Sequence, residues 1–171
     1  HNNLVVLELD PLRSKKHLQQ VVMLQLIAQL QTECYLGDRN RKKVIIIDEA
    51  WELFEDPIVA QFLNGAYRRF RKYFSSCVVV TQSLGDLYTS PCGHAIANNS
   101  ANTIVLRQNS EAISNLRKTE KFNVGDYGFR MLESLHTEPG QYSDVLLRSG
   151  DAWGVGRFTV DKFSRYLYTT N

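Results

Sequence analysis

The order of apolar and polar residues along the chain predicts strands that alternate with helices. Short unbroken apolar runs recur and end at polar residues, which is typical of strands buried on both faces. Longer segments between them carry apolar residues at helical spacing. The predicted strands are 4–9, 44–48, 77–81 and 103–106, and the predicted helices are 14–35, 57–73, 110–119 and 124–135.

Capping residues and the tail extend this pattern. Ser14 is a candidate N-cap of the first helix, and Pro57 suits the first turn of the second. Alternating residues over 142–147 and 153–160 predict an antiparallel hairpin near the end of the chain. Strands that alternate with helices imply right-handed crossovers, so we expect an α/β fold with a mainly parallel sheet flanked by helices.

Composition and charge narrow the class of protein. The length of 171 residues suits one domain, and 43% hydrophobic with 22% charged residues is ordinary for a soluble globular fold. The net charge of +2 gives little support to a nucleic-acid surface. Three widely spaced cysteines indicate neither a disulfide framework nor a zinc site, and they favour a reducing compartment. Because no run of about 18 apolar residues occurs, we expect no membrane span.

The strand at 44–48 carries the clearest chemical signal, because its apolar run ends in Asp48 and Glu49. Ligands of open α/β sheets bind beyond the carboxyl ends of the strands, which places this pair where nucleotide chemistry is usually done. The pattern is that of a Walker B strand, in which the Asp holds Mg²⁺ and the Glu polarises the attacking water. On these residues alone, a second interpretation is about as good as the ATPase one: the Asp-Glu pair occurs by chance at a strand end, and its carboxylates cap the next helix.

Polar residues also follow the next two strands. Gln82 comes directly after 77–81, and orientation of water by a Gln is an established device in nucleotide hydrolysis. Gln82 alone fits a loop contact equally well, but two consecutive strands that end in Asp-Glu and Thr-Gln favour a common site. Arg107 and Gln108 end the fourth strand at the same rim and are weaker candidates for nucleotide contact.

A basic segment lies between the strands that carry the acidic pair and Gln82. Arg68, Arg69, Arg71 and Lys72 fall on the predicted helix and the turn after it. A ring-forming ATPase needs an arginine that reaches a γ-phosphate, whereas the plain alternative is a solvated helix end where cations complement the dipole. Trp51 follows the acidic pair and is either a packing residue or a stacking surface for a partner.

The phosphate-binding loop is absent from the sequence. No G-x-x-x-x-G-K-[ST] occurs in the 171 residues, and the chain begins with His1 rather than Met. We therefore expect a fragment of a longer protein, cut just after the part that carried the loop.

Four segments of the chain resemble a known family. VVLELD…KHLQQVVMLQLI, VIIIDEAWELF, RRFRKYFSSCVVVTQSLGDL and GVGRFTVDKFSRYLYTT look like the C-terminal half of the TraC-type ATPases, the large conjugation ATPases of type IV secretion systems. These ATPases are related to the FtsK/HerA branch of RecA-like motors. The resemblance runs from about Leu4 to Tyr168, and IIDEAW followed by VVTQS is specific only as a pair. The resemblance implies that 1–171 is the distal part of one RecA-like, P-loop NTPase-type domain. In the family, the phosphate loop lies well upstream of the Asp-Glu strand.

The resemblance also implies roles for single residues and for the whole protein. Asp48 would hold Mg²⁺, Glu49 would be the catalytic carboxylate, Gln82 the polar sensor and Arg71 the arginine finger. The full protein would hydrolyse ATP in the bacterial cytoplasm, peripheral to the inner membrane at the secretion channel. It would act as a homo-oligomer, a hexamer, with other type IV secretion subunits to power pilus assembly and substrate transfer. The chain without its phosphate loop should neither bind nor hydrolyse ATP well.

Two other interpretations remain open at this point. A DNA-translocating or DNA-binding module of the FtsK/HerA kind would place 39–43 and 68–72 on a phosphate backbone and would bind with a steep dependence on salt. A catalytically inactive interaction domain is compatible with the missing loop, but the intact Asp48-Glu49 pair argues against it.

Overall fold

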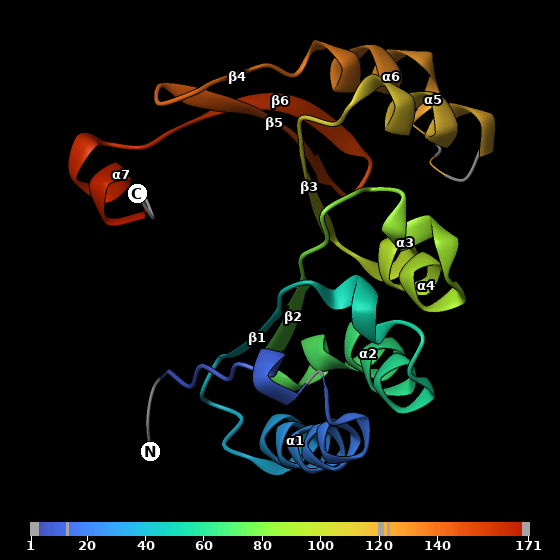
Figure 1. Ribbon diagram of the computed structural model, residues 1–171, viewed down its shortest axis with the longest axis vertical. Coiled ribbons are helices and arrows are strands. Elements are labelled where there is room, and N and C mark those ends of the chain that lie inside the picture. The colour runs from blue at the N-terminus through green and yellow to red at the C-terminus, as the bar shows by residue number, and fades with distance from the viewer. Residues whose placement is uncertain (1–3, 13, 120–121, 123, 169–171) are drawn as a thin grey trace.

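The computed structural model describes residues 4–12, 14–119, 122 and 124–168, which form two separate sheets with flanking helices (Figure 1). The first part of the chain contains α1 Lys16–Leu36, β1 Lys43–Ile47, α2 Pro57–Arg69, β2 Ser75–Val79, α3 Asp86–Thr89 and α4 Pro91–Asn99. The second part contains β3 Asn102–Leu106, α5 Ser110–Thr119, α6 Gly125–Ser134, β4 Thr137–Glu138, β5 Tyr142–Ser149, β6 Ala152–Thr159 and α7 Lys162–Tyr168. Three short 3-10 helices are η1 Asp10–Leu12, η2 Ala50–Leu53 and η3 Phe70–Tyr73.

The two sheets differ in strand direction. β1 and β2 pair in parallel, whereas β3 pairs antiparallel with β5, which also pairs with β4 and with β6 of the predicted hairpin. The expected parallel sheet is therefore correct for β1 and β2 only, and the placement of 103–106 in it is wrong. An apolar run predicts that a strand is buried but not which strand lies beside it. Here β5 is the partner of β3, and it comes from the tail hairpin.

The predicted strand at 4–9 is also wrong in this structure. Its residues form no strand, and the apolar side chains of 4–7 are exposed, with Val6 at 80%. An extended segment becomes a strand only when a neighbouring strand satisfies its backbone N–H and C=O groups. No strand of the described residues pairs with this segment.

The central parallel pair is buried on one face rather than two. Val44 and Ile46 of β1 alternate with the half-buried Ile45 and Ile47, and are 62% and 68% exposed. β2 alternates in the same way. The helices of the described chain cover one face of this pair, so the expected burial on both faces is not met.

Local sequence accounts for the start of α2. The Asp56 carboxylate accepts hydrogen bonds from the backbone N–H groups of Ile58 (2.9 Å) and Val59 (3.1 Å), which an N-terminus leaves without helical partners. Pro57 takes the first helical position, where its missing N–H is harmless. The predicted helix at 57–73 is confirmed, as α2 continued by η3.

Other helix predictions had mixed outcomes. The helices at 110–119 and 124–135 and the tail hairpin are confirmed. Ser14 is not the cap of α1, because Lys15 takes the N-cap position with no side-chain hydrogen bond. The helices α3, α4 and α7 were not predicted. For α4, the sequence Ser90-Pro91 is typical of a helix N-terminus. The Ser90 hydroxyl caps this helix by accepting a hydrogen bond from the backbone N–H of Gly93 at 3.0 Å.

Each sheet has its own hydrophobic core. The core beside β1 and β2 consists of Ile27, Cys34, Ala50, Phe54, Val59, Phe62, Leu63, Ala66, Phe70, Cys92 and Ile96. The core beside the antiparallel sheet consists of Leu84, Val105, Ile113, Leu116, Phe122, Phe129, Leu132, Leu135 and Leu146. Because Leu84 lies shortly after β2, the chain enters the second core directly beyond the tip of the parallel pair.

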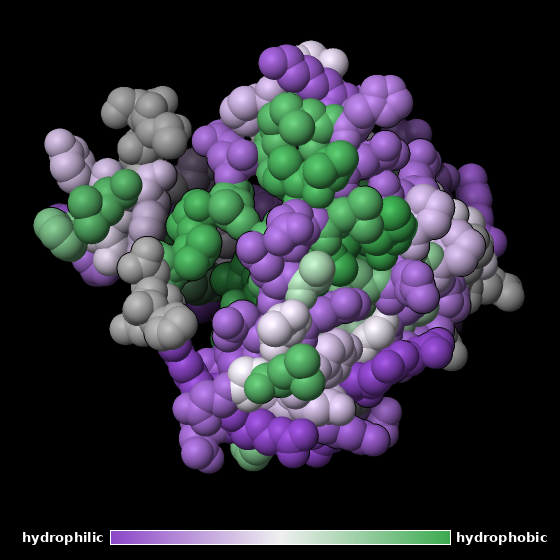
Figure 2. Space-filling view, turned by 90° about the horizontal axis from the view of Figure 1, so that it is seen from below, coloured by the Kyte–Doolittle hydropathy of each residue, from purple (hydrophilic) through white to green (hydrophobic). Residues whose placement is uncertain are grey.

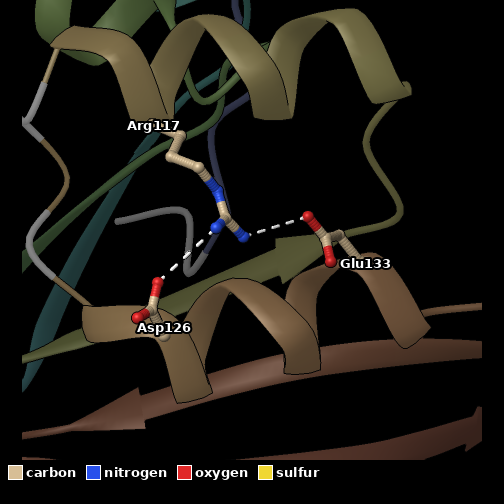
Figure 3. Close-up of polar contacts among 3 residues, drawn as sticks. All are labelled: Arg117, Asp126 and Glu133. Carbon is tan, nitrogen blue, oxygen red and sulfur yellow. Dashed lines mark hydrogen bonds and ion pairs between the residues drawn. The ribbon is translucent and has the colours of Figure 1, made fainter.

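Arg117 joins α5 to α6 at the surface (Figure 3). Its guanidinium lies 3.5 Å from Asp126 and 3.2 Å from Glu133, and it also lies over the ring of Phe129. All three groups are on one side of α6, so a single side chain ties the two helices together.

α1 leaves apolar side chains uncovered. Val21 is 61% exposed, and Leu18 and Leu24 are each 47% exposed. Figure 2 looks at the molecule from below, the side on which α1 lies in Figure 1, and shows separate apolar groups among polar ones. Within the described part of the chain, no helix combines the length and apolar character that a membrane crossing needs.

Candidate active site

The carboxyl ends of β1 and β2 bring the predicted acidic and amide residues together. The backbone N–H of Val80 donates to Ile47 O at 2.9 Å, and that of Ala50 donates to Val80 O at 3.1 Å. These two bonds clamp the chain on either side of Asp48 and Glu49. Gln82 follows two residues after Val80, so it leaves the sheet at the same edge.

Glu49 lies at the centre of the site. The Gln82 amide Nε2 donates to its Oε1 at 2.9 Å, and the Trp51 indole Nε1 donates to its Oε2 at 2.8 Å. Its own backbone N–H donates to Asp48 Oδ1 at 3.0 Å. A carboxylate has an acceptor on each of its two oxygens, and here each oxygen takes a hydrogen bond from a side-chain N–H.

The backbone at Glu49 is in the left-handed region. Its φ of 51° and ψ of 35° cost a residue with a Cβ about 1–2 kcal/mol relative to the right-handed helix. Residues two apart on a continuous helix do not face each other, but the reversal at Glu49 lets its side chain meet Trp51. Strained backbone of this kind occurs at functional sites, where the surrounding structure holds it in place. Here the two clamping bonds and the fully buried Ala50 hold the turn.

Asp48 is exposed beside Glu49, and a carboxylate is a kind of ligand that Mg²⁺ takes in proteins. Mg²⁺ in nucleotide sites is bound by one or two carboxylates, with waters and substrate phosphates completing the shell. The described residues contain no cluster of three or more His, Cys, Asp or Glu. A single Asp at the strand tip is therefore the kind of donor set that suits a phosphate-bound Mg²⁺, and it does not suit an all-protein metal cage.

The turn that carries Gln82 is held from two sides. The Asp86 carboxylate accepts from the backbone N–H of Ser83 at 3.0 Å, and Gln108 Oε1 accepts from that of Leu84 at 3.2 Å. Gln108 follows β3, so its side chain bridges the tips of the two sheets. Sequence analysis placed Gln108 at this rim as a weak candidate for nucleotide contact, and the structure shows it bonded to the Gln82 turn.

Arg71 lies apart from these residues. It is exposed on η3, immediately before β2, and the parallel register of β1 and β2 places that point at the opposite edge from Asp48, Glu49 and Gln82. The basic loop 39–43 lies at the same edge: the guanidinium of Arg39 is 5.5 Å from the centre of the Tyr73 ring. The structure thus brings two basic segments together, and away from the acidic site of the same chain.

The cysteines take no part in this site. Cys34, Cys77 and Cys92 are free thiols, and Cys34 and Cys92 are buried. Burial raises the pKa of the Cys77 thiol to about 12, so it stays protonated and poorly nucleophilic at neutral pH. Each behaves as a small apolar side chain.

The chain is similar in sequence to a known family and to two curated proteins. A family model described as the TraG P-loop domain matches residues 1–171. The chain is 28% identical over 174 residues to Protein TraC of Escherichia coli, an alignment that covers 98% of the chain and 20% of TraC. It is 32% identical over 93 residues to Type IV secretion system protein CagE of Helicobacter pylori, covering 54% of the chain and 9% of CagE.

A solved structure shares the fold. VirB4 of Thermoanaerobacter pseudethanolicus superposes with a TM-score of 0.65 at 22% identity, over 94% of this chain and 42% of the VirB4 chain. The chain thus spans about a fifth of TraC and less than half of the VirB4 structure.

Proposed function

We propose that this chain, which belongs to the TraG P-loop domain family, is part of a TraC/VirB4-type P-loop ATPase of type IV secretion and supplies the catalytic carboxylate of its ATP-hydrolysing site. The observation that carries this proposal is the 2.9 Å contact between Gln82 Nε2 and Glu49 Oε1, beside Asp48, at the tips of two parallel strands. In the Walker B interpretation, Asp48 holds the metal and Glu49 acts on water.

Each residue has a separate part in the proposed reaction. Asp48 would hold the Mg²⁺ of Mg-ATP, and the ion when bound would neutralise charge on the phosphates. Glu49 accepts the proton of the attacking water as general base. Gln82 holds Glu49 Oε1 and orients the water. The phosphate loop, which these 171 residues lack, would come from the rest of the longer protein.

The same proposal covers the oligomeric state, the location and the task of the longer protein. It would act as a homo-oligomer, a hexamer, in the bacterial cytoplasm, peripheral to the inner membrane at the secretion channel, with other secretion subunits. ATP hydrolysis would power pilus assembly and substrate transfer, and Arg71 would serve the site as an arginine finger. The chain's likeness to TraC and CagE supports this proposal.

A substitution at Glu49 in the longer protein tests the proposal. Glu49→Gln keeps the size of the side chain but removes the general base, so hydrolysis should fall by about 10²–10⁴-fold. ATP binding should persist, since the phosphate loop is unchanged. Glu55→Gln, an exposed carboxylate in the following turn, is the matched control and should leave turnover intact. Normal turnover in Glu49→Gln would remove Glu49 from the mechanism.

DNA translocation or binding is a second candidate, because the structure brings two basic segments to one edge. The backbone N–H of Lys43 donates to Phe74 O at 3.1 Å, which places 39–43 beside 68–72. A DNA-binding edge predicts duplex affinity that falls steeply between about 50 and 200 mM salt. An affinity that barely changes with salt would reject this candidate.

A further inference from the structure

Trp51 donates a hydrogen bond to Glu49, and the proposed mechanism gives this contact no role. Its indole N–H donates to Glu49 Oε2 at 2.8 Å, while Gln82 donates to Oε1 of the same carboxylate. Each oxygen of Glu49 is therefore held by a separate neutral donor from a separate part of the chain. One donor follows β1 and the other follows β2.

Two donors restrict a carboxylate more than one does. The terminal torsion of a Glu side chain is broad, so a single hydrogen bond leaves the carboxylate free to rotate about that bond. A second donor on the other oxygen fixes the plane of the group. The orientation of the Glu49 carboxylate, and so the direction from which it would act on a water, depends on both donors.

The surroundings of Trp51 favour this role over packing. The indole is 42% exposed, whereas its neighbours in the turn, Ala50 and Phe54, are buried at 0% and 5% exposure. These two residues anchor the turn in the core, and the left-handed backbone at Glu49 directs the two side chains toward each other. The ring is therefore placed by the turn, with its polar end on Glu49.

We propose that Trp51 is a positioning residue for Glu49, whose carboxylate it orients through the indole N–H. This inference rests on the proposed ATPase function. Two other roles make different predictions. A ring that stacks on the nucleotide base would act on KM for ATP, and a ring that only packs would change neither kcat nor KM when replaced by Phe.

The contact itself is testable without catalysis. The chain has two tryptophans, so ¹⁵N-labelled protein gives two indole N–H signals in an NMR spectrum, assigned with Trp51→Phe and Trp153→Phe. Glu49→Ala should shift the Trp51 signal and speed its exchange with solvent, while the Trp153 signal stays in place. Glu55→Ala is the control and should move neither. If Glu49→Ala leaves both signals unchanged, Trp51 does not bond to Glu49 and the proposal is overturned.

Steady-state kinetics of the longer protein test the consequence. Trp51→Phe keeps an aromatic ring and removes the N–H, so kcat should fall by about 10- to 100-fold through misplacement of the base. KM for ATP should stay within about twofold. Trp153→Phe, a conservative change at the antiparallel sheet, should keep both values.

The possible outcomes separate the two proposals. A kcat within about threefold of wild type, or a raised KM at unchanged kcat, overturns the role of Trp51. Rapid hydrolysis by Glu49→Gln overturns the proposed function itself. An inactive Glu49→Gln enzyme together with a fully active Trp51→Phe enzyme rejects only the positioning role.

Discussion

Arg71 provides a demanding test of how the site would be completed in an oligomer. It precedes β2, whereas Glu49 and Gln82 follow β1 and β2, so the parallel register separates them by the length of a five-residue strand. At the rise of a β-strand, that separation is about 17 Å along the sheet. Arg71 therefore lies at the opposite edge from the site of its own chain, and we predict that it reaches the γ-phosphate of a neighbouring subunit.

The size of the effect follows from the role of an arginine finger. Such a residue contributes about 10³–10⁵-fold to turnover, so Arg71→Ala should lower hydrolysis by about that factor. ATP binding by each subunit should persist, because the phosphate loop and Asp48 are untouched. Lys42→Ala removes an exposed cation from the same edge and is the matched control. It should leave turnover within about twofold of wild type.

Mixed oligomers of the longer protein distinguish action across subunits from action within one. Arg71→Ala and Glu49→Gln subunits are each inactive alone. In a random equal mixture with head-to-tail interfaces, about one interface in four joins an intact Glu49 to an intact Arg71. The mixture should then recover about a quarter of wild-type hydrolysis, measured by phosphate release. If Arg71 acted in its own chain, no subunit of the mixture would carry both residues.

Two results would refute this reasoning. An inactive mixture whose assembly is normal by native mass spectrometry rejects a finger supplied in trans. A loss of turnover in Lys42→Ala as large as that in Arg71→Ala would show that general positive charge at this edge matters, and not a single arginine.

Two further predictions concern the isolated chain. Titration with Mg-ATP should show no saturable binding below about millimolar ligand, because the phosphate loop is absent; micromolar binding by calorimetry would contradict this. Asp144 accepts from Arg157 Nε at 2.9 Å, and this hydrogen bond holds the pKa of the Asp144 carboxyl below its usual range. Because the folded pKa is lowered, the stabilisation is present above about pH 4 and is lost as pH falls through the folded pKa. Wild type should therefore lose more stability than Asp144→Asn between about pH 5 and 3, measured by urea unfolding, and equal losses would exclude Asp144 as the cause.

The sequence by itself predicted most of the longer helices, the tail hairpin and the members of the proposed site. Pro57 predicts the start of α2 because a proline suits the first turn of a helix whatever surrounds it. Asp48, Glu49 and Gln82 were expected to meet because parallel strands carry their carboxyl ends to one edge. That expectation needs only the order of two strands and their shared direction.

Only the tertiary structure decided which strands became neighbours and how the site residues are bonded. An apolar run is equally compatible with several partners. The strand 103–106 was expected in the parallel sheet and is found beside β5, and no strand of the described residues pairs with 4–9. The left-handed turn at Glu49 and its bond to Trp51 depend on the clamp between the strands. The bridge from Gln108 to Leu84 joins residues 24 positions apart and exists only once both sheets are assembled. Periodicity reports which face of an element is buried, whereas contacts between distant residues are set by the packing of the whole domain.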